Sequence, residues 1–183
     1  MRKIIAAMNM TLDGNCDHTA GLPVEGMHEH YTELLNQADS ILYGRTTFQL
    51  MEYWRTILKN PSEEKSTNDF AIAIDKISKV VFSRTMKEVD WDSARLSVKT
   101  IEEEVLELNQ QSGKNILVGS PSLIIQLMKL NLIDEYQCCV HSVLAGGGMK
   151  LFENSNDRTI LKLVKTKTFG GSAVLLYYES TKK

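Results

Sequence analysis

Two short apolar runs in this chain each end in a glycine, and each glycine is followed by residues typical of a helix start. Residues 41–44 end at Gly44, and residues 115–119 end at Gly119. A short apolar run closed by glycine is typical of a buried strand, while hydroxyl residues or proline directly after it favour a helix. The repeated pattern indicates an α/β fold with a mostly parallel sheet covered by helices.

Other segments extend this alternation. Strands are predicted at 3–10, 79–83 and 135–144, and helices at 25–37, 46–57, 100–110 and 122–130, the third of these opened by a capping box of Thr100 and Glu103. Residues 161–169 and 173–179 predict a C-terminal antiparallel hairpin. Residues 59–68 are polar, contain proline and lack periodicity, so they predict an exposed loop or frayed helix.

Length and charge restrict the possible classes of protein. A chain of 183 residues fits one domain, here residues 1–183, and a net charge of -2 provides no broad basic field for nucleic acid. No apolar stretch approaches membrane-spanning length, so a cytoplasmic location without membrane contact is the default expectation. The adjacent Cys138 and Cys139 lie in a predicted strand and point to opposite faces, which indicates reduced packing residues and no metal site.

The turn after residue 43 is a candidate phosphate site. Backbone N–H groups at a helix start point outward unpaired, and Arg45, Thr46 and Thr47 stand beside them. The alternative is an ordinary strand-to-helix junction with Thr46 as N-cap. Gly119 and Gly146 also follow strands, so the three glycine turns are expected on one rim of the sheet, where ligands of such folds bind. No Gly-x-Gly-x-x-Gly follows the first strand, which disfavours a standard Rossmann fold.

The order of five short motifs resembles the dihydrofolate reductase-like superfamily. These motifs are Leu-Asp-Gly at 12–14, Gly-Arg-Thr-Thr-Phe at 44–48, Phe-Ser-Arg-Thr at 82–85, Gly-Ser-Pro-Ser-Leu-Ile at 119–124 and Leu-Ile-Asp-Glu at 132–135. Within the superfamily, Ile-Asp-Glu at 133–135, His141 and the segment 146–152 are most similar to the reductase domain of bifunctional riboflavin-biosynthesis proteins. Ser142 stands where that family usually has proline. The deaminase motifs are absent from this sequence, so a stand-alone reductase domain is expected.

The resemblance implies a three-layer α/β/α fold of the dihydrofolate reductase type that holds NADPH across the carboxyl rim of the sheet. The family's cofactor positions correspond here to Gly44, Arg45, Thr46, Thr47, Ser83, Arg84, Gly119, Ser120 and Ser122. Ser83 and Arg84 match the segment that meets the adenosine 2′-phosphate, which favours NADPH over NADH. The alternatives are that Arg84 is a solvated surface cation, and that Gly119 and Ser120 only form a turn and a cap.

Two carboxylates are candidates for the catalytic group. Asp13 matches the loop that closes over the nicotinamide, although Asp-Gly is also a common turn pair. Glu25 is the nearest analogue of the carboxylate that binds the pterin in dihydrofolate reductases, while counting back from Gly44 places His28 there instead. An ordinary solvated carboxylate at Glu25 or Glu29 remains the alternative.

For the substrate, Gly147 and Lys150 are the candidate contacts, with Lys150 as a possible partner for a phosphate, and His141 is expected to pack or to form hydrogen bonds. The expected reaction is reduction of a ribosylamino-pyrimidine, as in a 5-amino-6-(5-phosphoribosylamino)uracil reductase. Dihydrofolate reductase activity on a pterin and a non-catalytic, nucleotide-binding dimeric protein are the alternatives. The resemblance also implies a homodimer.

Overall fold

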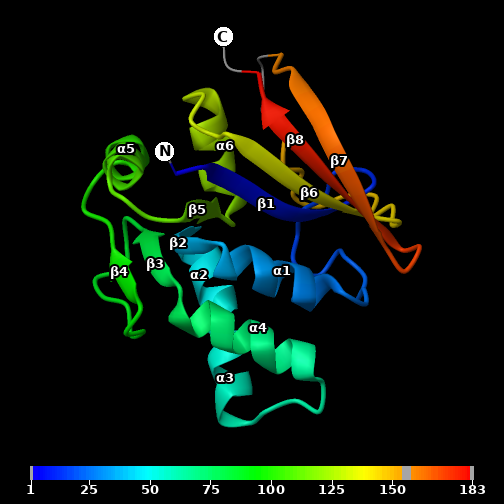
Figure 1. The fold of residues 1–183 in the computed structure, drawn as a ribbon, viewed down its shortest axis with the longest axis horizontal. Helices are drawn as coiled ribbons and strands as arrows, with labels where there is room; N and C mark the ends of the chain where they lie inside the picture. Colours follow the sequence, from blue (N-terminus) through cyan, green and yellow to red (C-terminus); the bar gives the residue numbers. More distant parts are fainter. Residues whose placement is uncertain (1, 154–157, 182–183) are drawn as a thin grey trace.

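The computed structural model describes residues 2–153 and 158–181, which form one eight-stranded sheet with helices on both faces (Figure 1). The strands run in the order β4-β3-β2-β5-β1-β6-β8-β7. The strands are β1 (Ile4–Thr11), β2 (Ala38–Gly44), β3 (Ser78–Phe82), β4 (Ala94–Leu96), β5 (Asn115–Val118), β6 (Glu135–His141), β7 (Leu161–Phe169) and β8 (Ala173–Ser180). The helices are α1 (Met27–Asn36), α2 (Arg45–Met51), α3 (Tyr53–Lys59), α4 (Lys65–Lys76), α5 (Ile101–Gln110) and α6 (Pro121–Lys129).

The central strands are apolar on both faces because each face lies against a different layer of helices. On β1, Ile4 and Ala6 enter the core beneath α5 and α6, whereas Ile5 enters the core beneath α1, α2 and α4. Leu42 and Ile41 of β2 divide between the two cores in the same way. Side chains of successive strand residues point to opposite faces, so an unbroken apolar run is what a covered strand requires. The predicted three-layer α/β/α fold is confirmed (Figure 1).

The last two strands of the chain bring antiparallel pairing into an otherwise parallel sheet. All contacts among β1 to β6 are parallel, whereas β8 pairs antiparallel with both β6 and β7. The β7–β8 turn places Gly170 and Gly171 at φ values of 52° and 74°, a conformation that glycine adopts without strain. The predicted hairpin is therefore confirmed.

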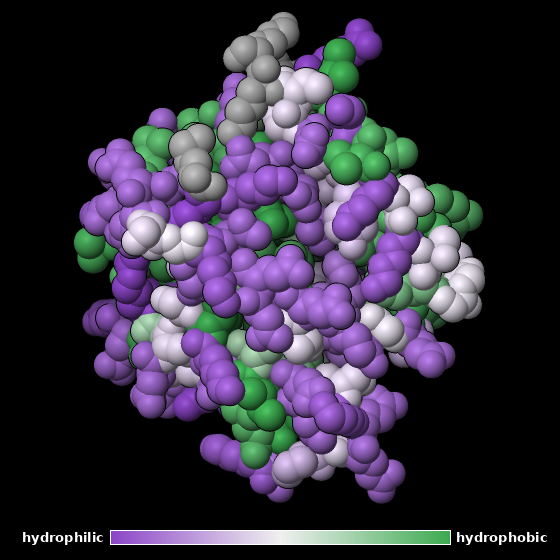
Figure 2. Space-filling model, in the orientation of Figure 1, coloured by the Kyte–Doolittle hydropathy of each residue, from purple (hydrophilic) through white to green (hydrophobic). Residues whose placement is uncertain are grey.

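Hydrophilic side chains cover most of the face in Figure 2, and hydrophobic ones show only in small groups between them.

On the side of β3 and β4, one predicted helix was wrong and two elements were missed. Helix α4 was not predicted, and its first turn occupies residues that were assigned to a loop or frayed helix. The predicted helix over 46–57 is two helices that meet at Glu52 and begin one residue earlier, with Gly44 and not Thr46 as the N-cap. Strand β4 was also missed, because only three residues form it and none of them is fully buried.

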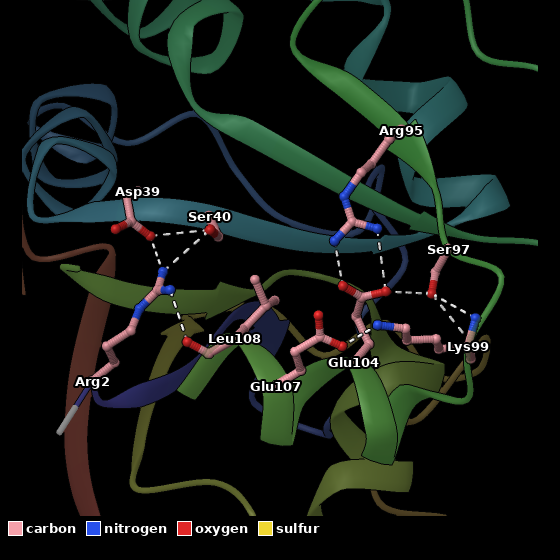
Figure 3. Close-up of polar contacts among 9 residues, drawn as sticks. All are labelled: Arg2, Asp39, Ser40, Arg95, Ser97, Lys99, Glu104, Glu107 and Leu108. Carbon is pink, nitrogen blue, oxygen red and sulfur yellow. Dashed lines mark hydrogen bonds and ion pairs between the residues drawn. The ribbon is translucent and has the colours of Figure 1, made fainter. Parts of the chain in front are cut away.

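Arg2 and Arg95 connect α5 to the sheet, Arg2 through a hydrogen bond and Arg95 through an ion pair (Figure 3). Arg2, which is 6% exposed, pairs with Asp39 at the start of β2 and donates to the Leu108 carbonyl oxygen at 2.9 Å. Arg95 of β4 donates from both terminal nitrogens to the carboxylate of Glu104 on α5. The Glu104 side chain is only 3% exposed, so Arg95 compensates a charge that the fold removes from water. At the start of α5, the predicted capping box of Thr100 is formed as expected.

Candidate active site

A large cavity lies at the carboxyl ends of β1, β2 and β5. Its volume is about 1260 Å³, and residues of helices α1 to α4 also line it. Pockets for single ligands usually measure about 300–1,000 Å³, so this cavity has room for a cofactor together with a substrate. Parallel strands place their carboxyl ends on one edge, and this is why residues far apart in the sequence meet here.

The turns after β2 and β5 lie against each other at one end of the cavity. The hydroxyl oxygen of Ser120 accepts a hydrogen bond from the backbone N–H of Gly44 at 2.9 Å. Ser120 occupies the N-cap position of α6, as expected, but its side chain makes this bond across to β2 and does not cap the helix. A Cβ at Gly119 would lie 3.0 Å from Tyr43 Cε1, tighter than an ordinary contact. The glycine therefore lets this turn pack closely against the ring of Tyr43.

Arg45 links the β2 turn to the turn after β3. It lines the cavity, and its guanidinium donates to the hydroxyl of Thr85 at 3.0 Å. Ser83 shapes the second turn, because its hydroxyl oxygen accepts from the backbone N–H groups of Thr85 and Met86 at 3.2 and 3.0 Å. Arg84 is exposed beside this turn. A guanidinium next to a helix start is a suitable arrangement for a phosphate group.

The nine predicted cofactor residues fall into three groups. Six line the cavity: Gly44, Arg45, Thr46, Thr47, Gly119 and Ser122. Ser120 is buried beneath the glycine turns, where it holds them together. Ser83 and Arg84 lie outside the cavity lining, on the turn that Arg45 contacts through Thr85. The structure thus brings the β2 and β5 segments together and places the β3 segment next to them.

Asp13 holds two loops together and is not among the residues that line the cavity. Its carboxylate accepts from the Thr11 hydroxyl at 2.5 Å and from the backbone N–H groups of Ala145 and Gly146 at 3.1 and 2.9 Å. The hydrogen bond from Thr11, followed by those from the two N–H groups, lowers the pKa of Asp13 to about 2. The carboxylate therefore stays ionised at any ordinary pH and fastens the loop after β1 to the glycine segment after β6.

The predicted substrate residues Gly147 and Lys150 lie in that same glycine segment. The Gly147 carbonyl oxygen accepts from the Asn15 side-chain amide at 2.5 Å, and Lys150 pairs with Asn15 in an antiparallel bridge. Neither residue lines the cavity, although Asn15 does. Gly148 between them has a φ of 93°, and a Cβ there would collide with the Asn15 side chain. This segment thus supports the cavity wall through Asn15.

The start of α1 forms a further part of the cavity wall. Glu25, His28 and Glu29 all line the cavity, so both alignments of the carboxylate position lead to the same wall. The ring of His28 stacks on Phe70 with centroids 5.6 Å apart and meets Trp54 edge-on at 5.4 Å. The wall therefore combines carboxylates with aromatic rings. Flat aromatic surfaces of this kind are well suited to a planar ring.

Several residues of this wall were not recognised from the sequence. Phe70 belongs to α4 and Glu64 precedes it, so both were hidden by the failure to predict that helix. His141, expected to pack or to form hydrogen bonds, ends β6 and also lines the cavity. Its Nδ1 accepts from the Leu22 backbone N–H at 3.3 Å, while Nε2 is buried and has no partner among the described residues. Burial lowers the pKa of this imidazole.

Metal binding, membrane-spanning helices and cysteine pairing can each be checked in the described residues. Across residues 2–153 and 158–181, no three His, Cys, Asp or Glu side chains come together as a metal site would require. Within the same ranges, none of the helices has the length and apolar character needed to cross a membrane. Cys16, Cys138 and Cys139 are free thiols.

Comparison with known proteins places this site in a family. Uncharacterized protein YyaP of Bacillus subtilis is 35% identical over 181 residues, which cover 97% of this chain and 94% of that protein. Uncharacterized protein YwjB of the same organism is 27% identical, covering 91% of this chain and 87% of its own length.

Solved structures share the fold at low sequence identity. A putative riboflavin biosynthesis protein from Shewanella sp. PV-4 superposes with a TM-score of 0.73 at 19% identity, covering 98% of this chain and 99% of that one. The diaminohydroxyphosphoribosylaminopyrimidine deaminase/5-amino-6-(5-phosphoribosylamino)uracil reductase of Thermotoga maritima gives 0.65 at 14% identity, with 98% of this chain matched to 56% of that one. The model of the RibD C-terminal domain matches residues 2–175, and the chain therefore belongs to the RibD C-terminal domain family.

Proposed function

We propose that the chain is an NADPH-dependent reductase of the riboflavin-biosynthesis type, acting on a ribosylamino-pyrimidine or a related small heterocycle. The observation that carries this proposal is one cavity of about 1260 Å³ that is lined both by the glycine turns with Arg45 and by aromatic rings. The turns have the character of a phosphate site, and the rings have that of a site for a planar ring. Membership of the RibD C-terminal domain family supports a reductase.

The residues at the glycine turns fit a dinucleotide phosphate. Gly44 and Gly119 both line the cavity, and neither carries a side chain between its backbone and a ligand. Arg45 and the amides at the start of α2 would bind the pyrophosphate, and Arg84 on the adjacent turn would meet a 2′-phosphate. When bound, NADPH supplies hydride to the carbon of a substrate C=N bond, and the nitrogen gains a proton.

The rest of the cavity positions the substrate and excludes water. Trp54 and Phe70 pack edge-to-face with centroids 4.5 Å apart and present an apolar wall. Asp13 fixes the loop after β1, which contributes Asn15 and Cys16 to the lining, against the segment after β6. Positioning and exclusion of water are the main contributions that a protein makes to hydride transfer.

A dihydrofolate reductase is the second candidate. The observation that favours it is the pair of carboxylates at the start of α1, Glu25 and Glu29, both of which line the cavity. A carboxylate at this wall can accept hydrogen bonds from the ring nitrogen and amino group of a pterin. Dihydrofolate therefore belongs in the same substrate screen.

Titration with NADPH and NADH tests the cofactor assignment. We expect tighter binding of NADPH, weaker binding of both nucleotides in Arg45→Ala, and loss of the NADPH preference in Arg84→Ala. Arg158→Ala is the matched control, because Arg158 is exposed and lies outside the cavity lining. NADPH oxidation with ribosylamino-pyrimidines and with dihydrofolate then identifies the substrate class. Binding without turnover on any heterocycle would favour a nucleotide-binding protein without catalysis.

We also propose a homodimer that forms through β7. Leu163 and Val164 lie at a bulge in this strand, and each remains 50% exposed. Ile160, just before the strand, is 60% exposed. Strand β7 is the edge of the sheet, and exposed apolar residues on an edge favour association. Light scattering should report a dimer that Leu163→Lys dissociates, whereas Leu106→Lys on α5 leaves it intact.

A further inference from the structure

The charged residues that line the cavity are mostly acidic. Among the described residues that line it, Arg45 is the sole arginine or lysine, and it stands at the glycine turns. The same lining carries four carboxylates, those of Asp17, Glu25, Glu29 and Glu64. Apart from histidines, every titratable charge on the described lining is therefore acidic except Arg45, which stands beside the glycine turns assigned above to the cofactor.

The carboxylates at the start of α1 are available to a ligand. Within the described ranges, no hydrogen bond or ion pair engages Glu25 or Glu29, whereas Asp17 accepts from Thr19 and Glu64 from Thr67. Lys150, the cation expected to meet a substrate phosphate, does not line the cavity. A phosphate at this wall would be repelled by like charges and would lack a cationic partner.

His141 provides an independent indication of what the ligand carries. The residue is 3% exposed, and its Nδ1 accepts a hydrogen bond from the Leu22 backbone N–H. In the neutral imidazole the proton therefore sits on Nε2, which is a donor without an acceptor in the described part of the chain. A buried donor of this kind is normally satisfied by a partner. A carbonyl oxygen of a bound heterocycle would supply it.

We propose that the substrate is an unphosphorylated heterocycle, neutral or cationic, that presents N–H donors to Glu25 and Glu29 and a carbonyl oxygen to His141. This inference rests on the proposed function, because it assigns the glycine turns to NADPH. If the substrate carries no phosphate, the enzyme acts after a reaction that removes the phosphate, or it acts on a compound that never carried one. The substrate site then discriminates against phosphate by charge, while the cofactor site binds it.

The test compares one ribosylamino-pyrimidine with its 5′-phosphate ester. Binding of each is measured by calorimetry in the presence of NADPH, and turnover is followed by NADPH oxidation. We expect the unphosphorylated compound to bind at least about tenfold more tightly. The double variant Glu25→Gln/Glu29→Gln should reduce this ratio by improving binding of the phosphate ester. Glu102→Gln on α5 is exposed and outside the cavity lining, and it should leave the ratio unchanged.

The His141 contact is tested with two variants. His141→Gln keeps a side-chain N–H donor and should largely retain affinity for the unphosphorylated compound, whereas His141→Phe should weaken this affinity about tenfold and raise KM by about the same factor. Neither should alter the discrimination against phosphate.

The outcomes separate this inference from the function on which it rests. Preferred binding and turnover of the phosphate ester would overturn the inference and leave the reductase proposal intact. If neither compound binds although NADPH does, the inference is overturned together with the pyrimidine substrate class. If NADPH does not bind, the proposed function fails.

Discussion

Replacing Arg95 with methionine should destabilise the protein through the carboxylate that it leaves behind. Glu104 is 3% exposed and accepts from both terminal nitrogens of Arg95 and from the Ser97 hydroxyl, the latter at 2.6 Å (Figure 3). Loss of one partner from a fully buried ion pair costs about 3–5 kcal/mol. Because Arg95 is 50% exposed and Ser97 remains, we expect the free energy of unfolding to fall by about 2 kcal/mol.

The assay is a double-mutant cycle by urea unfolding. Arg95→Met/Glu104→Leu removes both charges and should regain most of the loss, because replacing a buried ion pair with apolar side chains is often close to neutral. The exposed pair of Lys99, which precedes α5, and Glu107 on α5 provides the control, and its cycle should show little coupling. Equal coupling in the two pairs would refute the reasoning.

The effect of Arg95→Met should also depend on pH with a defined sign. Burial raises the pKa of Glu104, but the hydrogen bonds from Arg95 and Ser97 outweigh it and hold the pKa below its ordinary value of 4.5. A carboxylate with a lowered pKa in the folded state stabilises the protein above its unfolded pKa, and this contribution is lost as the pH falls through the folded pKa. The difference between wild type and Arg95→Met should therefore shrink below pH 4.5.

Three smaller changes test other parts of the fold. Ser120→Ala leaves the Gly44 N–H without its partner and should cost about 1–3 kcal/mol in urea unfolding and weaken NADPH binding; unchanged values in both assays would contradict the link between the turns. Thr100→Ala removes the α5 cap and should cost about 1 kcal/mol, with no change in NADPH affinity. Burial lowers the pKa of His30, so the unfolded chain takes up a proton first and stability should fall as the pH drops below 6.5; His30→Phe should flatten this dependence in thermal unfolding.

The architecture could be predicted because its strands are covered on both faces. The segments of β2 and β5 are short apolar runs closed by glycine, and such a run is typical of a strand that is covered on both faces. Helix α4 gives a weaker signal, since its first residues are polar and its fully buried residues are Ala71, Ala73 and Ile74. Strand β4 gives no strand signal in the sequence, because Arg95 lies at its centre. The position of β4 depends instead on its pairing with β3 and on the ion pair with Glu104.

Only those parts of the site that lie directly at the carboxyl ends of parallel strands could be predicted from the sequence. Gly44 and Gly119 meet because β2 and β5 are parallel neighbours, and this could be read from the order of the motifs. The sequence did not indicate that Ser120 would bond to Gly44 and not to its own helix, since a serine before proline is an ordinary N-cap. Asp13 likewise binds amides at Ala145 and Gly146, far along the chain, and no local pattern reveals such contacts.

The central position of β1 in the sheet has a consequence for how the chain folds during synthesis. Ile4 pairs with Ile116, and Ile5 pairs with Glu135, so both partner strands are translated long after β1. At a translation rate of about 5–20 residues per second, the apolar residues of β1 remain without their partner strands β5 and β6 for on the order of ten seconds. The closure of such distant pairings also slows folding. Chaperone dependence of the nascent chain should therefore persist until β6 has emerged from the ribosome.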